Sequence, residues 1–300
     1  MPTRAKIIKR AETKVSSQAK PKGSNESKPK SVDLTIDPEK TLEKLENFLK
    51  EKLESSGFEG YIVGLSGGID SSLTATIAVN AVGLERVLGL SMPHGSAAPD
   101  SGDLISKLTK MQGLKVTEID ISRMITAYYT NIKTVNPVRL GNKVSRERMS
   151  ILFDQAFESR LLVLGASNRT EIALGYMTWF GNTASSVNLL GQLYKTQIRQ
   201  LAMHLKLPKE IIETPPTADL WPGQTDEEEL GLKYDEVDKL LALMVDHNIQ
   251  SRTKLAEYGF DDATMDRTIA LANRYYFKRR CPDNAFLGLP DIPDTITLKK

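Results

Sequence analysis

The chain has 300 residues, of which 40% are hydrophobic, so it can form the core of one large α/β domain or of two small ones. Its one cysteine, Cys281, cannot form an internal disulfide bond, and no Cys/His cluster has the spacing of a zinc site. No apolar run approaches the roughly 20 residues that cross a bilayer, and no apolar signal core lies near the N-terminus. We therefore expect a cytoplasmic protein without a membrane span.

The formal charge of +2 is unevenly distributed, because residues 1–31 carry nine Lys and Arg residues against only Glu12 and Glu26. This Ser- and Pro-rich segment has a charge of +7 and few large apolar residues, which predicts a disordered basic tail. A nucleic-acid arm and an organelle transit segment are alternatives, but we favour a solubilising extension and expect no nucleic-acid partner. One domain then occupies residues 32–290, and residues 291–300 form a C-terminal tail.

Helices and strands alternate through the first half of the domain. Asp37 and Pro38 are typical of a helix start, as N-cap and first helical residue. Apolar runs then predict strands at 61–65, 87–90 and 115–121, with helices at about 70–82 and 103–111 between them. Strands that alternate with helices form a parallel sheet with right-handed crossovers.

A helix at about 144–158 leads to a fourth apolar strand at 161–165. If this strand returns to the other side of the first one, the fold is a doubly wound parallel sheet with helices on both faces. The loops after Leu65 and Gly165 would then face each other across a ligand-binding crevice. Further helices are expected at 196–205, 234–245 and 261–278, and the long acidic loop at 213–229 is typical of a mobile lid.

The turn after the first strand has the composition of a phosphate-binding loop. Its glycines let the backbone approach an anion, and the next helix presents free N–H groups and the positive end of its dipole. The Walker A lysine is missing, which excludes a P-loop of the kinase type. The loop resembles the SGGxDS pyrophosphate loop (PP-loop) of the ATP pyrophosphatases, whose fold is adenine nucleotide alpha-hydrolase-like. By that resemblance the ATP-binding residues are Gly64, Leu65, Ser66, Gly67, Gly68, Ile69, Asp70 and Ser71.

Two carboxylates are candidate ligands for Mg²⁺, which prefers hard oxygen donors and bridges phosphate oxygens. Asp70 lies in the phosphate loop, and Glu171 follows the fourth strand. Both would face the same crevice. Glu171 taken alone is more typical of a first-turn helix carboxylate, and its relation to Asp70 is what favours a metal site.

Several further segments, in the right order, resemble the ammonia-dependent NAD synthetase family over roughly residues 38–288. They include Gly141-Asn142, Arg146, Arg148-Met149, Gly191 to Thr196, Pro215 to Leu220, Asp226 to Gly231 and Tyr234 to Asp238. The resemblance implies a carbon–nitrogen ligase of NAD biosynthesis. Such an enzyme adenylates the nicotinate carboxylate of deamido-NAD with ATP and amidates it with ammonia.

Roles of single residues follow only from this resemblance. Lys195 and Thr217 would contact ATP, with Lys195 a catalytic residue beside Asp70 and Glu171. Arg146 and Lys278 would bind the acceptor. The resemblance also implies a homodimer and Mg²⁺ as cofactor. No glutaminase domain fits in this length, so the nitrogen source is free ammonia or a separate glutaminase.

Departures from the family pattern gather on the acceptor side. Where the family has Thr-Lys-Tyr-Gly-Asp-Gly and a further Asp, this chain has Thr178-Trp179-Phe180-Gly181-Asn182-Thr183 and then Ser186. Phe277 replaces a His, and Ala166 replaces a Thr. Three alternatives therefore stay open: a paralogue that activates another carboxylate, an ATP pyrophosphatase for tRNA modification or sulfur transfer, and a nucleotide-binding regulatory protein without turnover.

Overall fold

The computed structural model describes residues 30–95, 101–133, 135–217 and 223–282. The predicted tails therefore fall outside the described residues, except for residues 30 and 31. Here the Lys30 amide donates to the Glu257 carbonyl at 3.0 Å. In the described ranges, no helix combines the length and the apolar character that a bilayer crossing requires.

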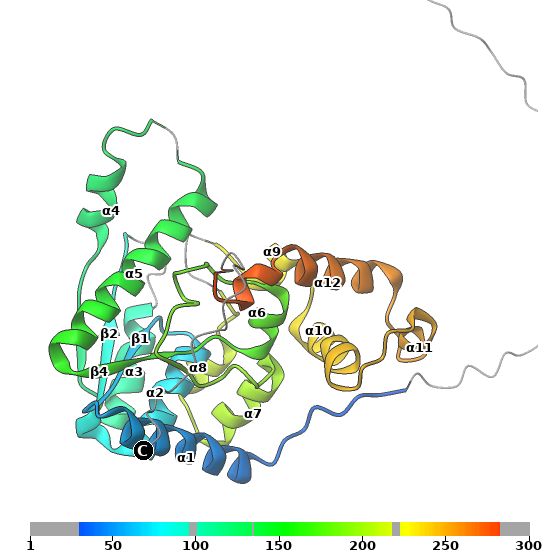
Figure 1. Cartoon of the computed structure of the whole chain (residues 1–300), viewed down its shortest axis with the longest axis horizontal. Helices are drawn as coiled ribbons and strands as arrows, with labels where there is room; N and C mark the ends of the chain where they lie inside the picture. The colour runs from blue at the N-terminus through cyan, green and yellow to red at the C-terminus, as the bar shows by residue number, and fades with distance from the viewer. Residues whose placement is uncertain (1–29, 96–100, 134, 218–222, 283–300) are drawn as a thin grey trace, which may run out of the picture.

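A parallel five-stranded sheet forms the centre of the fold (Figure 1). In spatial order its strands are β3 (Val116–Glu118), β2 (Val87–Ser91), β1 (Gly60–Leu65), β4 (Leu161–Gly165) and β5 (Val187–Asn188). The winding direction reverses between β1 and β4, where Val63 pairs with Leu164. The predicted doubly wound sheet is thus confirmed, including the return of the fourth strand to the other side of the first.

Helices cover both faces of the sheet. On one face lie α1 (Pro38–Ser56), α2 (Ile69–Val82), α3 (Ser101–Gln112), α7 (Lys195–His204) and α8 (Lys209–Glu213). On the other lie α4 (Ser122–Tyr129) and α5 (Pro137–Ser159). The pleat of β1 explains the division, because Tyr61 and Val63 are buried in the first core cluster and Ile62 in the second.

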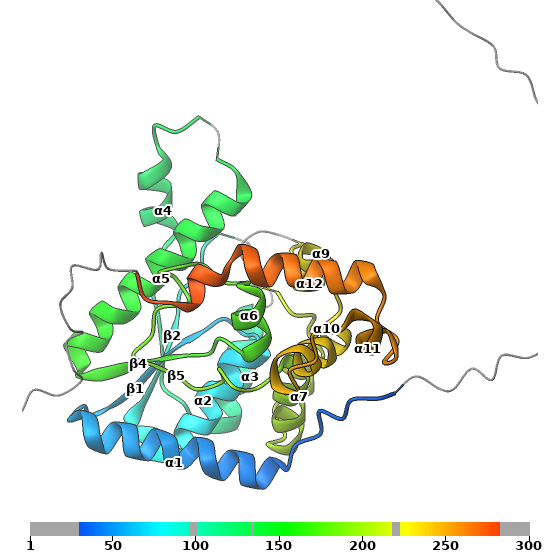
Figure 2. The same cartoon turned by 45° about the vertical axis from the view of Figure 1, so that its right-hand side comes forward.

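A second group of helices follows the sheet (Figure 2). It contains α6 (Arg169–Leu174), α9 (Asp226–Leu230), α10 (Tyr234–Leu241), α11 (Arg252–Ala256) and α12 (Asp262–Arg274). The short elements η1 (Leu84–Arg86), η2 (Ala242–Asp246) and η3 (Tyr276–Arg279) complete the chain. Two apolar clusters hold this group together, and Val32 packs against both, so the segment before α1 ties them to each other.

Several element limits differ from the sequence predictions. The strand predicted at 115–121 is shorter, and the helix predicted at 144–158 already begins at Pro137, where Asn136 caps it. The helix predicted at 234–245 ends at Leu241 and continues as a π turn, and the one at 261–278 breaks after Arg274. The predicted loop at 213–229 contains the start of α9.

Candidate active site

The glycine-rich turn between β1 and α2 is held by its own serines. The Gly68 amide donates to Ser66 Oγ at 3.2 Å, and Ser71 Oγ donates to the Gly68 carbonyl at 3.1 Å. Gly67 has φ +81°, and a Cβ there would lie 3.0 Å from the Ser101 carbonyl oxygen, so only glycine fits. The turn therefore presents a fixed backbone at the N-terminus of α2.

The predicted loop residues divide into two groups. Gly64, Leu65, Ser66, Asp70 and Ser71 line a cavity of about 440 Å³, as does Thr217. Gly67 and Gly68 form the backbone of the turn, and the side chain of Ile69 is buried in the core, so it can offer a ligand only its backbone.

Asp70, Glu171 and Lys195 meet at the carboxyl ends of β1 and β4. The Lys195 ammonium pairs with Asp70 Oδ2, and its side chain is only 3% exposed against 19% for Asp70. Asn168 links the two carboxylates, because its Nδ2 donates to Asp70 Oδ1 at 3.0 Å while its backbone amide donates to Glu171 Oε2 at 3.2 Å. Three charged groups from distant parts of the sequence thus share one buried site.

Burial and like charge act strongly on Glu171. They raise the pKa of its carboxyl to about 8, first through burial and then through the charge of Asp70, while Lys195 acts in the opposite direction. Burial alone would lower the pKa of the Lys195 ammonium, but Asp70 and Glu171 raise it by more, so it stays above its ordinary value. Lys195 is therefore a permanent cation beside Asp70 and Glu171.

This donor set fits Mg²⁺. In the described ranges, no group of three or more His, Cys, Asp and Glu side chains could hold a metal ion. The protein therefore offers Mg²⁺ the two side chains of Asp70 and Glu171. Mg²⁺ sites at phosphates use one or two carboxylates and complete their shell with water and phosphate oxygens. Burial and the charge of Asp70 raise the pKa of Glu171, and a divalent cation held by the two groups would lower it and favour the carboxylate form.

Comparison with known proteins assigns the family. A family model described as NAD synthase matches residues 41–282. The chain belongs to the NAD synthase family. Its enzyme class, a ligase that forms a carbon–nitrogen bond, is the one predicted from the sequence.

Relatives of this family cover most of the chain. The NH₃-dependent NAD⁺ synthetase of Fusobacterium nucleatum is 43% identical over 249 residues, which cover 83% of this chain and 96% of that protein. The corresponding protein of Trichlorobacter lovleyi is 40% identical over 83% of this chain and 91% of its own length.

Solved structures agree with this assignment. An NMN synthetase from Francisella tularensis has a TM-score of 0.73 at 30% identity, covering 84% of this chain and 99% of its own. An NH₃-dependent NAD synthetase from Campylobacter jejuni has a TM-score of 0.71 at 30% identity, covering 84% of this chain and 100% of its own.

The acceptor residues predicted from the NAD synthase resemblance take two different positions. Lys278 lines the cavity, and its Nζ donates to the carbonyls of Gly175 at 2.8 Å and Met177 at 2.6 Å. Arg146 is exposed, and its Nε donates to the carbonyl of Trp179 at 3.1 Å. Burial and the nearby charge of Arg146 lower the pKa of Lys278, so the two cations are close enough to repel.

Two substitutions in the family pattern have local structural roles. Asn182 Oδ1 accepts a hydrogen bond from the Thr178 amide at 2.8 Å, which closes the turn between them. Ser186 Oγ accepts one from the Val163 amide of β4 at 3.2 Å. These side chains hold backbone at positions where the resemblance implies carboxylates.

Asn168 is a site residue that the sequence reasoning missed. It is fully buried, and it caps α6 through a reciprocal pair in which its Oδ1 accepts from the Glu171 amide at 2.9 Å. The spacing of Asn168 and Glu171 matches the N-terminal capping pattern, so the sequence held a usable signal. Its hydrogen bond to Asp70 depends on the folded sheet, and no sequence signal predicts it.

Asp226 is a further carboxylate beside the site, and it is fully buried. Its oxygens accept from the hydroxyls of Tyr176 at 3.1 Å and Tyr234 at 3.0 Å. Burial raises its pKa, although Lys195 and the two hydroxyls act in the opposite direction. The sequence reasoning gave it no role, because these partners come from α10 and from the turn after α6.

Asp238 fixes the start of the helix that carries Lys195. Its Oδ1 accepts from Thr170 Oγ1 at 2.5 Å and its Oδ2 from the Thr196 amide at 2.8 Å. Thr170 Oγ1 in turn accepts from the Lys195 amide at 3.1 Å. Asp238 thus connects α6, α7 and α10 and sets the position of Lys195.

Proposed function

We propose that this chain adenylates the nicotinate carboxylate of deamido-NAD with ATP and then transfers the acyl group to ammonia. The products are NAD, AMP and pyrophosphate. In a chain of this family, one observation gives the proposal its main support. Lys195 pairs with Asp70 at the end of the glycine turn, and both residues line one cavity together with Glu171. This is the charge arrangement needed to hold a triphosphate and its leaving group.

The chain's own residues supply binding and charge stabilisation. Ser66 and the backbone of the turn bind the distal phosphates, and Lys195 neutralises the negative charge that develops as pyrophosphate leaves. Asp70 and Glu171 would hold Mg²⁺, which when bound neutralises phosphate charge. The acceptor carboxylate attacks the α-phosphate in line with the leaving group. Ammonia then attacks the acyl adenylate and expels AMP.

The acceptor and the nitrogen source rest on the relatives. Both curated relatives described above are NH₃-dependent NAD⁺ synthetases, which supports deamido-NAD as acceptor and free ammonia as donor. Sulfur transfer is not favoured, since Cys281 is exposed and does not line the cavity. The same relatives give no support for a tRNA-modifying activity.

The test uses the purified full-length chain with ATP, Mg²⁺, ammonium and deamido-NAD. We expect AMP, pyrophosphate and NAD in equal amounts. Formation of AMP without NAD would exclude deamido-NAD as acceptor, and absence of both products would reject the reaction. An Asp70→Ala variant with full ATP cleavage would refute the role of Asp70.

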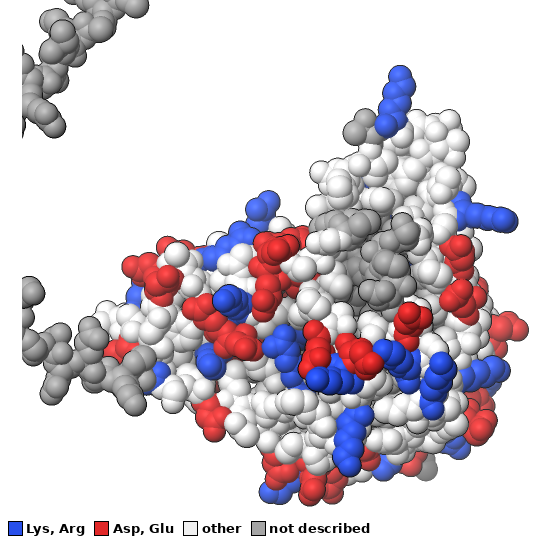
Figure 3. Space-filling view, turned by 180° about the vertical axis from the view of Figure 1, so that it is seen from behind, with Lys and Arg blue, Asp and Glu red and all other residues white. Residues whose placement is uncertain are grey.

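We also propose a homodimer formed through the projecting hairpin of α4 and α5. Its exposed apolar side chains include Met124 (46% exposed), Tyr128 (57%) and Val138 (52%). Figure 3 shows that this projection carries few charged side chains, whereas both signs are mixed over the rest of that face. An apolar projection with few charges is typical of a surface that a second copy covers.

Tyr128→Glu is expected to raise the dimer dissociation constant about tenfold or more, because it buries a charge in an apolar contact. Sedimentation equilibrium measures this constant. Phe58→Glu is the matched control, since Phe58 is an exposed aromatic residue (44%) outside the hairpin and the charge change is equal. Equal effects of the two variants, or a monomeric wild type, would contradict the proposal.

A further inference from the structure

A chain of hydrogen bonds connects the buried carboxyl of Asp226 with the exposed carboxyl of Glu229. Tyr176, in the turn after α6, lies between them, because its hydroxyl oxygen is 3.1 Å from Asp226 Oδ1 and 2.8 Å from Glu229 Oε2. Asp226 is only 3% exposed, whereas Glu229 is exposed. All three residues line the active-site cavity, and the segments that carry them gather beside the sheet (Figure 2). The chain therefore joins the buried part of the cavity to solvent.

The hydrogens of this chain satisfy every contact only if it holds one additional proton. The Tyr176 hydroxyl has one hydrogen, so it can donate to Glu229 or to Asp226 but not to both at once. Gln224 Nε2 donates to Glu229 Oε2 at 2.8 Å and holds that carboxyl beside the tyrosine. When Tyr176 donates to Glu229, its contact with Asp226 is a hydrogen bond only if the Asp226 carboxyl carries a proton. Asp226 can therefore pass a proton to Tyr176 along a contact that is already formed.

Asp226 is a buried carboxylate that the adenylation step does not use. In the part of the chain that the structure describes, the carboxylates that line the cavity are Asp70, Glu171, Asp226 and Glu229. Asp70 pairs with Lys195, and Asp70 and Glu171 are the proposed ligands of Mg²⁺. The two oxygens of Asp226 each accept one tyrosine hydroxyl, so each retains a lone pair for a further donor. Asp226 is thus the buried carboxylate that is available to take a proton inside the cavity.

The position of Asp226 suits the second step of the reaction. The charge of Lys195 lowers its pKa and the charge of Asp70 raises it, so Asp226 is near the groups beside which the acyl adenylate must form. Burial has the largest effect and raises the pKa of Asp226, which makes its carboxylate a stronger base. Asn182 also lines the cavity, at a position where the resemblance implies a carboxylate, but an amide cannot serve as a base.

Given the function proposed above, we propose that Asp226 binds the ammonium ion and is the general base of the amidation step, while Tyr176 and Glu229 conduct protons to solvent. Ammonium transfers one proton to the Asp226 carboxylate, and the ammonia that results forms a bond with the carbonyl carbon of the acyl adenylate. The proton on Asp226 moves to the Tyr176 oxygen as the Tyr176 hydrogen moves to Glu229 and then to water. Asp226 then takes a second proton from the attached nitrogen. The bond between the carbonyl carbon and AMP breaks, and AMP leaves with the electron pair.

A second nucleophile tests the role of Asp226. Ammonia is mostly protonated at neutral pH, whereas hydroxylamine is mostly a neutral amine and needs no base before it attacks. For Asp226→Asn, kcat/KM for ammonium is expected to fall about hundredfold or more, the loss typical of a general base, while hydroxamate formation with hydroxylamine falls far less. Exchange of pyrophosphate into ATP without an amine measures adenylation and should persist. Equal losses with both nucleophiles, no loss, or loss of the exchange would overturn the assignment.

Two tyrosine variants test the path of the proton. Tyr176→Phe and Tyr234→Phe each remove one hydroxyl from Asp226, but only the Tyr176 hydroxyl also contacts Glu229. Tyr176→Phe is expected to lower kcat with ammonium about tenfold or more, and Tyr234→Phe clearly less, because Tyr234 is 1% exposed and leads to no exposed group. Glu229→Gln should lower kcat in the same direction as Tyr176→Phe. Equal losses for the two tyrosine variants would overturn the proton path.

This inference and the proposed function can fail separately. A wild type that forms AMP and pyrophosphate from deamido-NAD and ATP, but no NAD when ammonium is present, would reject the proposed function. A wild type that forms NAD while Asp226→Asn keeps its full rate with ammonium would reject the role of Asp226 alone.

Discussion

Lys195→Met is expected to lower kcat for pyrophosphate release by about three orders of magnitude, the loss typical when a preorganised charge stabiliser is removed. The ammonium is 3% exposed and pairs with Asp70, so water cannot replace it at low energetic cost. Methionine keeps the apolar stem and removes only the charge. Single-turnover formation of AMP, followed by rapid quench, measures the chemical step.

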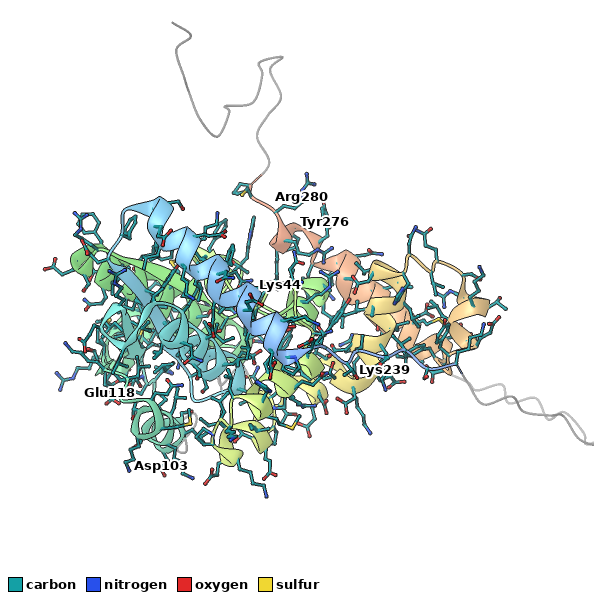
Figure 4. The ribbon with its side chains drawn as sticks, turned by 90° about the horizontal axis from the view of Figure 1, so that it is seen from below. Lys44, Asp103, Glu118, Lys239, Tyr276 and Arg280 are labelled. Atoms are coloured by element: carbon teal, nitrogen blue, oxygen red, sulfur yellow. The ribbon has the colours of Figure 1, made fainter. Side chains whose placement is uncertain are left out.

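Two variants control this experiment. Lys239→Met removes an exposed lysine from α10 with the same change of charge, and Figure 4 labels this residue at the surface. It should leave kcat unchanged. Lys195→Arg keeps the charge and should retain more activity than Lys195→Met. If Lys195→Met mainly raises KM for ATP while kcat is retained, Lys195 binds ATP without stabilising the leaving group.

The order of the sheet could be predicted because each buried strand is a continuous apolar run. Tyr61 to Leu65 and Leu161 to Gly165 are such runs, and both faces of these strands are covered by helices. β5 was missed because Val187–Asn188 has only two residues, too few for a periodic pattern. Its pairing with β4 depends on tertiary structure.

Short helices escaped prediction for a related reason. α6 has six residues and α11 five, so neither completes two turns of an apolar pattern. The long helix α5 was predicted to begin late, although Asn136 and Pro137 carry the same start pattern that located α1. The local start signal is therefore present in the sequence, although the apolar periodicity becomes clear only from about Val144.

The site shows the same division between local and distant signals. Asp70 and Glu171 each follow a strand that the apolar runs predict. The doubly wound topology then places both residues in one crevice. Asn168, Asp226 and Asp238 act through partners about 50 to 100 residues away in the chain. No spacing rule connects such residues, and only the folded structure brings them together.

Asp238→Ala is expected to reduce the free energy of unfolding by about 3 kcal/mol, because it leaves two buried donors without acceptors. These donors are Thr170 Oγ1 and the amide of Thr196, and Asp238 itself is fully buried. Since Thr170 also holds the Lys195 amide, kcat should fall about tenfold to hundredfold from misplacement of the lysine. Urea unfolding and AMP formation measure the two effects.

Asp235→Ala on the same helix is the control, because Asp235 forms an exposed ion pair with Arg199 whose loss costs roughly 0–1 kcal/mol.

The pH dependence of this stability has a definite sign. Burial raises the pKa of Asp238, while its bonds with Thr170 and Thr196 act in the opposite direction and do not cancel the effect. A carboxyl with a raised pKa in the folded state stabilises the fold below its unfolded value of about 4 and loses that contribution as pH rises through the folded value. Wild type should therefore gain stability relative to Asp238→Asn as pH falls from neutral towards about 4. A difference between the two proteins that shrinks on acidification would show that the carboxylate is the form that Thr170 and Thr196 stabilise, and that Asp238 is ionised throughout.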